Sequence, residues 1–185
     1  MGYFSKIYSL FNKSAQGQTL DRPEHVQLNQ VERRSSMRLD ARKGTNALIV
    51  DDSPTIVFAL KKMLESTGYN TFQALNAEQG IELARAEQPD IIFLDIVLPG
   101  MNGFTALRLL RRDPATQPIP IIMMSSNEQA TEQFFGSRIG ADDFMKKPFS
   151  RLEVFARIER LLGEDMLPHR SGSSAQTAAA GGAKM

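Results

Sequence analysis

Residues 91–103 read IIFLDIVLPGMNG, and this stretch decides the fold. Its first four residues form a continuous apolar run, which is typical of a strand buried on both faces of a parallel sheet. The run ends on a carboxylate, Asp95, and Pro99, Gly100 and Gly103 then stop the strand and turn the chain. In open α/β sheets, ligands and chemistry gather outside the carboxyl ends of the strands. Asp95 is therefore either a cap of the following loop or a residue that carries chemistry.

Short apolar runs alternate with helical patterns on both sides of this stretch, from residue 46 to residue 163. The apolar runs predict strands at 47–50, 69–74, 91–94, 121–124 and 144–146. The helical patterns predict helices over about 54–66, 77–88, 104–112, 128–138 and 151–162. Such alternation predicts an α/β domain, a single doubly wound five-stranded parallel sheet with helices on both faces.

The expected helices begin at residues that suit an N-cap. Ser53 is followed by Pro54 at the first helical position, and Asn76, Asn127 and Ser150 precede three further helices. Side-chain oxygens of Ser and Asn accept hydrogen bonds from the free N–H groups of a first helical turn. We therefore expect each of these Ser and Asn side chains to cap its helix.

The flanking segments differ in composition from this domain. Residues 1–45 are predicted to form an N-terminal extension, with an amphipathic helix over about 2–11 and then a flexible basic linker. One face of that helix carries an aromatic and aliphatic stripe: Tyr3, Phe4, Ile7, Tyr8 and Phe11. The stripe is too short to be stable alone, so it docks on its own domain or on a partner, or it inserts into a membrane surface. Residues 164–185 are predicted to be a disordered tail.

Composition excludes several classes of function. The chain has no cysteine, which excludes disulfides, thiolate metal sites and cysteine nucleophiles. Its two histidines, His25 and His169, lie outside the patterned region and argue against a histidine-based site. No apolar stretch could span a bilayer and no secretory signal is present, so a cytoplasmic protein is expected. Association with a membrane or cell pole through residues 2–11 stays an alternative.

Charge is distributed unevenly along the chain. Residues 1–45 carry eight Lys/Arg against four Asp/Glu, whereas residues 46–163 carry twelve against fifteen. A mildly acidic domain therefore follows a basic arm. We expect no binding of nucleic acid by this domain.

Polar residues stand where the predicted strands end. Asp51 and Asp52 follow the first strand, Asp95 ends the third, Ser125 follows the fourth and Lys147 follows the fifth. Three carboxylates at one edge repel each other and need a counter-charge, which a hard cation such as Mg²⁺ provides with oxygen ligands. A lysine and a hydroxyl beside them would stabilise a phosphoryl group during its transfer onto a carboxylate. Asp95 is the natural nucleophile.

Four motifs in this order resemble the response-regulator receiver family of two-component signalling. They are VDDSP at 50–54, FLDIVLPGMNG at 93–103, MMSS at 123–126 and KKPF at 146–149. The resemblance covers about residues 46–163 and implies the flavodoxin-like strand order 2-1-3-4-5. It also implies that Asp95 is the phosphoacceptor, and that Asp51 and Asp52 bind Mg²⁺ together with it.

The resemblance assigns further roles. The backbone carbonyl of Val97 is an expected metal ligand, and Ser125 matches the switch hydroxyl. Lys147, rather than Lys146, matches the active-site lysine. Phe144 stands at the position of the aromatic switch residue, and because Phe has no hydroxyl, a switch there depends on burial of the ring.

The function implied by this resemblance is that of a single-domain response regulator. Such a protein takes a phosphoryl group from a histidine kinase or a histidine phosphotransfer protein and signals through residues of about 128–160. It is not an enzyme beyond its own phosphorylation and dephosphorylation, and it is a monomer or a weak homodimer. The segments DDSPT and DIVLPGMNGF most resemble regulators of chemosensory systems that control twitching motility by type IV pili.

Three other functions compete with this interpretation. The first is a receiver-fold adaptor that is never phosphorylated and acts through its N-terminal helix. The second is a small phosphohydrolase, which needs a general acid where this chain has Val97. The third is a flavodoxin-type carrier, which needs a phosphate loop rich in Ser, Thr and Gly where this chain has DDSPT.

Overall fold

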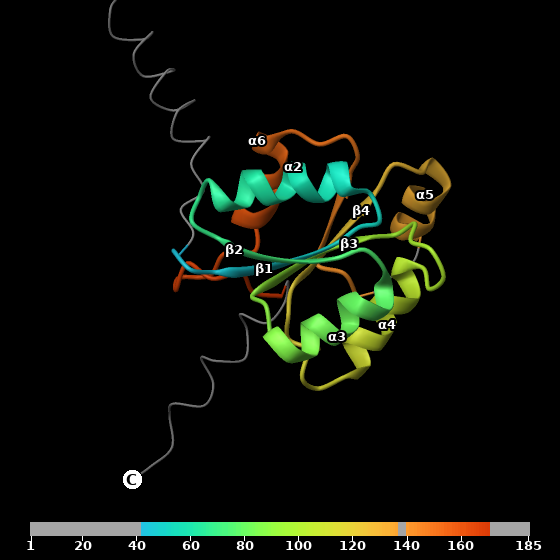
Figure 1. Cartoon of the computed structure of the whole chain (residues 1–185), viewed down its shortest axis with the longest axis horizontal. Coiled ribbons are helices and arrows are strands. Elements are labelled where there is room, and N and C mark those ends of the chain that lie inside the picture. The colour runs from blue at the N-terminus through green and yellow to red at the C-terminus, as the bar shows by residue number, and fades with distance from the viewer. Residues whose placement is uncertain (1–41, 137–139, 171–185) are drawn as a thin grey trace, which may run out of the picture. The chain divides into compact units, whose positions relative to one another are not determined.

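The computed structural model describes residues 42–136 and 140–170 (Figure 1). Its strands are β1 (Asn46–Val50), β2 (Asn70–Ala74), β3 (Ile91–Asp95), β4 (Ile121–Ser125) and β5 (Asp143–Lys146). Its helices are α2 (Pro54–Glu65), α3 (Ala77–Glu87), α4 (Gly103–Arg112), α5 (Glu128–Gly136) and α6 (Arg151–Glu159). The helix expected over residues 2–11 lies outside the described residues, as do residues 12–41 of the linker expected over 12–45 and residues 171–185 of the expected tail.

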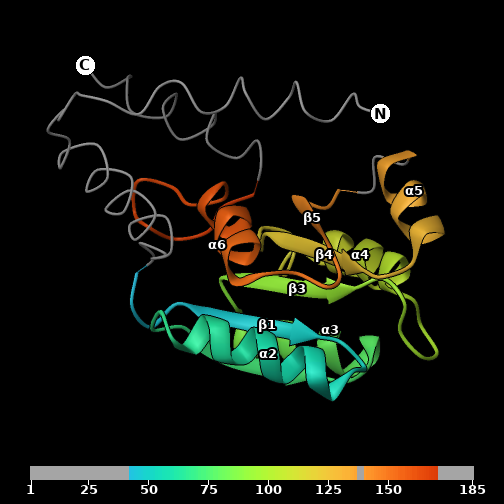
Figure 2. The same cartoon turned by 90° about the horizontal axis from the view of Figure 1, so that it is seen from above.

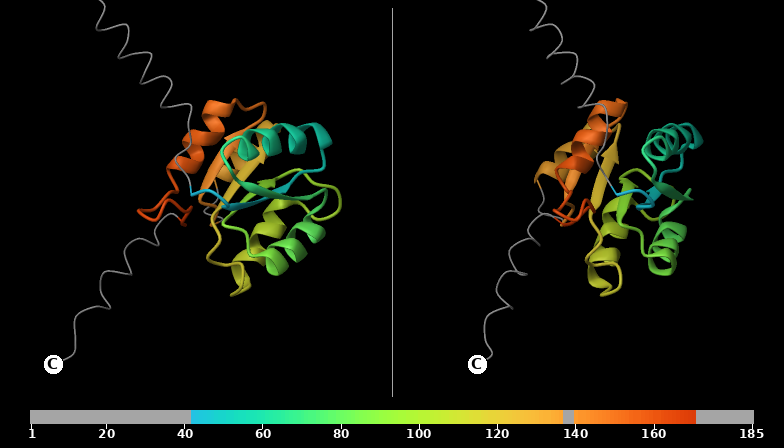
Figure 3. Two further views of the ribbon diagram at one scale, coloured as in Figure 1. Left: turned by 60° about the vertical axis from the view of Figure 1, so that its left-hand side comes forward. Right: turned by 90° about the vertical axis from the view of Figure 1, so that its left-hand side faces the viewer.

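The strands form one parallel sheet in the order β2-β1-β3-β4-β5, which confirms the expected fold class and strand order. Figure 2 shows β1, β3, β4 and β5 in this order. Helices α2 and α6 cover one face, and α3 and α4 cover the other (Figures 1 and 3). Central strand β3 is buried along its whole length. The apolar run at residues 91–94 therefore lies in the middle of the sheet.

Successive side chains of the strands serve two separate cores, because side chains alternate between the faces of a sheet. Leu48 and Leu94 pack on the side of α3 and α4, with Ala130 and Phe134 of α5 against the same cluster. Ile49 and Phe93 pack on the side of α2 and α6. A sheet covered in this way has only its strand ends available for chemistry.

The expected N-cap at Ser53 is confirmed in position, with Pro54 at the start of α2, but only the other three expected N-caps make a capping hydrogen bond. The side chains of Asn76, Asn127 and Ser150 accept hydrogen bonds from N–H groups of α3, α5 and α6, at 2.8, 3.1 and 3.2 Å. Ser53 stands at the N-cap position of α2, but its side chain makes no capping hydrogen bond. Its backbone N–H instead donates to Oδ1 of Asp51 at 3.0 Å, so this turn serves the carboxylate rather than the helix.

The domain extends beyond the expected limits of 46 and 163. The backbone N–H of Arg42 donates to the carbonyl of Met166 at 3.1 Å, and that of His169 donates to Leu161 at 2.6 Å. Leu162 forms an antiparallel bridge with Pro168, which is buried. The prediction of a disordered tail is therefore wrong for residues 164–170, since they fold back onto the domain. Among the helices that the structure describes, none is long and apolar enough to cross a membrane.

Candidate functional site

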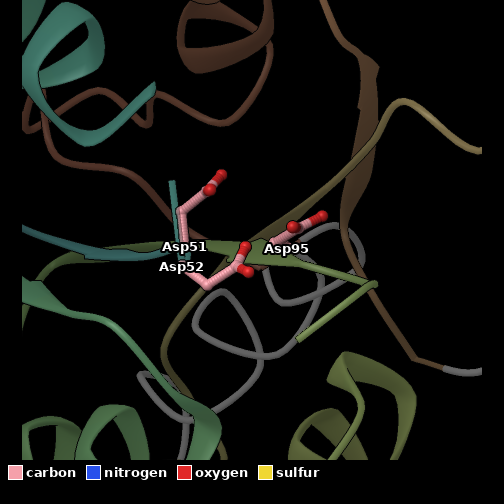
Figure 4. A group of neighbouring side chains, drawn as sticks. All are labelled: Asp51, Asp52 and Asp95. Atoms are coloured by element: carbon pink, nitrogen blue, oxygen red, sulfur yellow. The ribbon is translucent and has the colours of Figure 1, made fainter. Parts of the chain in front are cut away.

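Three carboxylates meet at the carboxyl edge of the sheet. Asp51 and Asp52 directly follow β1, and Asp95 is the last residue of β3, which pairs with β1. One oxygen from each of the three side chains lies within 4.8 Å of the others (Figure 4). Asp51 and Asp95 are buried, whereas Asp52 is exposed. The strand order thus brings together residues that are far apart in the sequence.

The backbone fixes the two buried carboxylates firmly. The N–H of Asp51 donates to the carbonyl of Ala74 at 3.1 Å, while the Asp51 side chain accepts from Ser53. Beyond Asp95, the N–H of Ile96 donates to Met124 and that of Gly103 donates back to Ile96, both at 2.9 Å. These bonds hold the strand ends on both sides of the site.

Gly103 lets α4 begin directly against the backbone of Asp95. A Cβ atom at this position would stand 2.8 Å from Cα of Ile96 and closer still to the carbonyl oxygen of Asp95. Any side chain would therefore push the start of α4 away from the end of β3. The sequence places Gly103 among the residues that stop the strand and turn the chain, but it does not show how closely α4 approaches the end of β3 there.

Lys147 supplies a positive charge to both buried carboxylates. Its Nζ lies 2.5 Å from Oδ2 of Asp51 and 2.9 Å from Oδ2 of Asp95, and its side chain is only 10% exposed. The side chain of Lys146, by contrast, is 58% exposed and lies 3.7 Å from Glu128 on the surface. The geometry therefore distinguishes the two lysines, because Lys147 contacts the buried carboxylates and Lys146 contacts a surface carboxylate.

The surroundings of Asp95 disfavour the charged form of its carboxyl group. Burial raises the pKa of its carboxyl above the usual range, and the neighbouring Asp51 adds to this rise. Lys147 opposes the rise through a hydrogen bond and its positive charge, but the pKa stays raised. A second cation would therefore be stabilised beside Asp95.

The residues fit a Mg²⁺ ion. Oδ1 of Asp95 is buried and accepts no hydrogen bond from the part of the chain that the structure describes. Buried acceptors without partners are rare, and hard cations bind such carboxylate oxygens. Val97 lies two residues beyond Asp95 with a half-exposed side chain, and its carbonyl as a further ligand stays a prediction.

Ser125 lies in β4, which pairs with β3, and Phe144 lies in β5, which pairs with β4. Ser125 ends β4 and is fully buried, and its Oγ accepts a hydrogen bond from the N–H of Asn127 at 3.0 Å. The ring of Phe144 in β5 is 6% exposed and packs on Phe134 and Phe135 of α5, at centroid distances of 4.9 and 5.5 Å. The hydroxyl is thus engaged by its own turn, and the ring is covered by the adjacent helix.

The model of the response regulator receiver domain family matches residues 47–159. The chain belongs to this family. Receiver domains act in two-component signalling, where they interact with histidine kinases or phosphotransfer proteins and bind Mg²⁺ in the active site. The resemblance drawn from the four motifs is confirmed.

Two relatives show how the match is distributed. Protein PilH of Pseudomonas aeruginosa is 43% identical over 115 residues, which are 62% of this chain and 95% of PilH. The DNA-binding dual master transcriptional regulator RpaA of Synechocystis is 40% identical over 128 residues, which are 69% of this chain. That match spans only 53% of RpaA, so the chain spans about half the length of this regulator.

Solved structures agree with the fold. The receiver domain of the sensor histidine kinase PA1611 from Pseudomonas aeruginosa has a TM-score of 0.59 and 29% identity, and covers 63% of this chain and 96% of that one. Its active-site cleft holds a coordinated magnesium ion. The chemotaxis protein CheY4 of Vibrio cholerae gives a TM-score of 0.59 with 25% identity, and covers 64% of this chain and 99% of that one.

Proposed function

We propose that this chain is a phosphoacceptor in which Asp95 receives a phosphoryl group from a histidine kinase or a histidine phosphotransfer protein. The observation that carries this proposal is the buried Asp95 carboxylate, with Asp51 and Asp52 within reach and Lys147 at 2.9 Å. A carboxylate in such surroundings contributes little to the packing of the domain. It is well suited to accept an anionic group that the cations around it neutralise.

The transfer forms one bond and breaks another. An oxygen of Asp95 attacks the phosphorus of a phosphohistidine, the P–N bond breaks, and the imidazole leaves with the electron pair and takes up a proton. Lys147 donates hydrogen bonds to the oxygens on which negative charge gathers. Asp51, Asp52, Asp95 and the Val97 carbonyl would hold Mg²⁺, which when bound supplies further neutralisation of that charge.

The signal is then read by a protein partner. Ser125 and Phe144 form the switch pair, the first by moving its hydroxyl to the phosphoryl group and the second by the burial of its ring. The surface formed by residues of about 128–160 changes its affinity for the partner. The phosphoryl group carries a charge of about −1.5 to −2 in place of the single negative charge of the carboxylate, and this change is enough to reorganise polar contacts nearby.

The pathway that we propose is control of type IV pili and twitching motility. Support comes from the 43% identity to PilH, which extends over 95% of that protein. The motifs DDSPT and DIVLPGMNGF support the same pathway.

Incubation with acetyl phosphate, with and without Mg²⁺, tests the proposal by intact mass. We expect a Mg²⁺-dependent gain of one phosphoryl group that is lost in Asp95→Ala and kept in Asp165→Asn, a surface control in the C-terminal turn. Absence of any gain under either condition would favour the adaptor, which acts without phosphorylation. A gain that persists in Asp95→Ala would assign the phosphoryl group to another residue.

A further inference from the structure

Helices α3 and α4 pack side by side against one face of the sheet and carry opposite charges (Figure 1). Helix α3 reads AEQGIELARAE, which contains three glutamates and one arginine. Helix α4 reads GFTALRLLRR, which contains three arginines and no acidic residue. This face of the domain therefore has an acidic half and a basic half.

Most of this charge is not paired within the domain. Arg85 of α3 lies 2.6 Å from Asp113. Arg111 of α4 lies 2.7 Å from Asp142. The other charged residues of the two helices are exposed and form no ion pair within the part of the chain that the structure describes: Glu78, Glu82, Glu87, Arg108 and Arg112. Opposite charges thus stand unpaired on neighbouring helices.

The two helices run in the same direction and start at the same level. Each follows a strand of the parallel sheet, so each begins at the carboxyl edge. Near their starts, a Cβ atom at Gly100, in the loop before α4, would lie 3.7 Å from Oε1 of Glu78. Near their ends, Arg85 of α3 pairs with Asp113, the C-cap of α4. The charges of the two helices can therefore be compared by their depth along each helix.

We propose that α3 and α4 form the interface of a two-fold symmetric homodimer. A symmetric interface uses the same surface of both copies, so this surface must be complementary to itself. A two-fold axis parallel to the helices places α3 of each copy on α4 of the other and brings acidic residues against basic ones in both contacts. An axis across the helices would place α3 on α3, and the glutamates would repel each other.

The unpaired charges match in depth across such a contact. Glu82 and Arg108 each lie five residues beyond the first residue of their helix. Glu87 lies ten residues and Arg112 nine residues beyond it. Leu109, beside this set, is 37% exposed and adds apolar surface to the contact. The two-fold axis repeats the whole set, so four unpaired charges of each copy gain partners.

The interface is small, and we expect the dimer to be weak. Each helix is about 16 Å long and about 10 Å wide. Two such helices bury less area than a standard interface of about 1,200–2,000 Å². Because the charged residues are exposed, salt screens their attraction, and the dissociation constant of the dimer should rise with ionic strength.

The dimer leaves the carboxylate site of each copy open. The three carboxylates lie at the strand ends, and α2 and α6 cover the opposite face of the sheet (Figures 1 and 3). The dimer therefore presents two such sites at once. A partner with two docking sites would bind both copies together and gain avidity.

Sedimentation velocity of the full chain, over concentrations up to the millimolar range and at low and high NaCl concentration, tests this inference. We expect a monomer–dimer equilibrium at low salt that shifts to monomer at high salt. Glu82→Arg/Glu87→Arg (the α3 variant) and Arg108→Glu/Arg112→Glu (the α4 variant) each oppose like charges across the contact. Each should raise the dissociation constant of the dimer roughly tenfold or more.

A mixture of the two variants tests the pairing itself. At the four exchanged positions the α3 variant is basic and the α4 variant is acidic, so the two should form a heterodimer about as readily as the unmodified protein dimerises. Glu132→Arg/Glu159→Arg makes the same change of charge as the α3 variant at exposed positions of α5 and α6, and should leave dimerisation unchanged. Far-UV circular dichroism checks that each variant is folded.

Four outcomes would overturn this inference. The first is an unmodified chain that stays monomeric at low salt over the whole concentration range. The second is a dimer that persists in both the α3 and the α4 variant, and the third is a dimer that their mixture does not restore. The fourth is loss of the dimer in Glu132→Arg/Glu159→Arg. None of these measurements requires phosphorylation of Asp95, so they leave the proposed function unaffected.

Discussion

Replacement of Lys147 by methionine should destabilise the protein, because the buried carboxylates then lack their positive partner. Methionine keeps most of the aliphatic stem but removes the ammonium group that lies 2.5 Å from Asp51 and 2.9 Å from Asp95. Removing one partner of a buried ion pair costs about 3–5 kcal/mol, because the remaining charge is left uncompensated. Since domains of this size are stable by only about 5–15 kcal/mol, a loss in that range should lower the urea midpoint severely.

Lys146→Met is the matched control. Its ammonium group is exposed and lies 3.7 Å from an exposed carboxylate of Glu128, and pairs of this kind contribute about 0–1 kcal/mol. Both variants lose one positive charge from adjacent positions, so a difference between them reports the buried pair rather than net charge. Urea unfolding followed by far-UV circular dichroism measures both.

Two conditions should reduce the deficit of Lys147→Met. Mg²⁺ at equal concentration should stabilise the variant more than the unmodified protein, because the cation replaces a charge that the variant lacks; a concentration of roughly 100 times the dissociation constant is worth about 2.7 kcal/mol. Acid should also help. Burial raises the pKa of Asp95 and Lys147 opposes that rise, so the loss of Lys147 should raise this pKa further. The folded variant then binds this proton more tightly than the folded unmodified protein does, so the deficit should shrink as pH falls through the carboxyl range.

Equal urea midpoints for Lys147→Met and Lys146→Met in Mg²⁺-free buffer at about pH 8 would refute this reasoning. Lys147 would then contribute no more than a surface charge. A deficit that is unaffected by both Mg²⁺ and pH would point instead to lost packing of the lysine stem.

Three further variants test other parts of the site. Asp95→Asn should gain no phosphoryl group from acetyl phosphate. Without Mg²⁺ this variant should be at least as stable as the unmodified protein, because a buried charge is removed. A clearly lower urea midpoint of the variant would contradict this. Gly103→Ala should destabilise by about 3 kcal/mol or more, since the new methyl group meets backbone rather than a side chain, whereas Gly44→Ala, with open space but a positive φ, should cost about 1 kcal/mol. A urea midpoint of Gly103→Ala above that of Gly44→Ala would refute the close approach. Arg111→Lys should lower the free energy of unfolding by about 2–4 kcal/mol. The half-buried guanidinium donates hydrogen bonds to Asp142 and to the carbonyls of Ile119 and Gly140, and one ammonium group cannot replace them all. A thermal midpoint equal to that of the unmodified protein would refute this.

The sequence predicted the sheet and the meeting of the carboxylates because both follow from short-range patterns. An apolar run such as 91–94 is recognisable by itself, and parallel strands necessarily bring their carboxyl ends to one edge. The sequence alone is therefore enough to place Asp51, Asp95 and Lys147 at the same edge of the sheet.

What the sequence could not predict depends on contacts between distant segments or on competition for a hydrogen bond. Ser53 stands at the N-cap of α2, but its side chain makes no capping hydrogen bond, and its N–H donates to Asp51. Residues 164–170 look polar and unpatterned, but they fold back because Met166 meets Arg42 and because Pro168 is buried beside Leu162. The bond from Asn127 to Ser125 is likewise absent from any local pattern, since many serines at strand ends have other partners.

The bond between Arg42 and Met166 has a practical consequence for engineering. Arg42 precedes the start of β1, so both ends of the folded domain lie together at the edge of the sheet opposite the carboxylates. Domains whose ends are adjacent tolerate circular permutation and insertion into a host protein. This domain could therefore be inserted into a loop of a fluorescent protein as a cassette, with the edge that carries Asp95 left accessible to a phosphodonor.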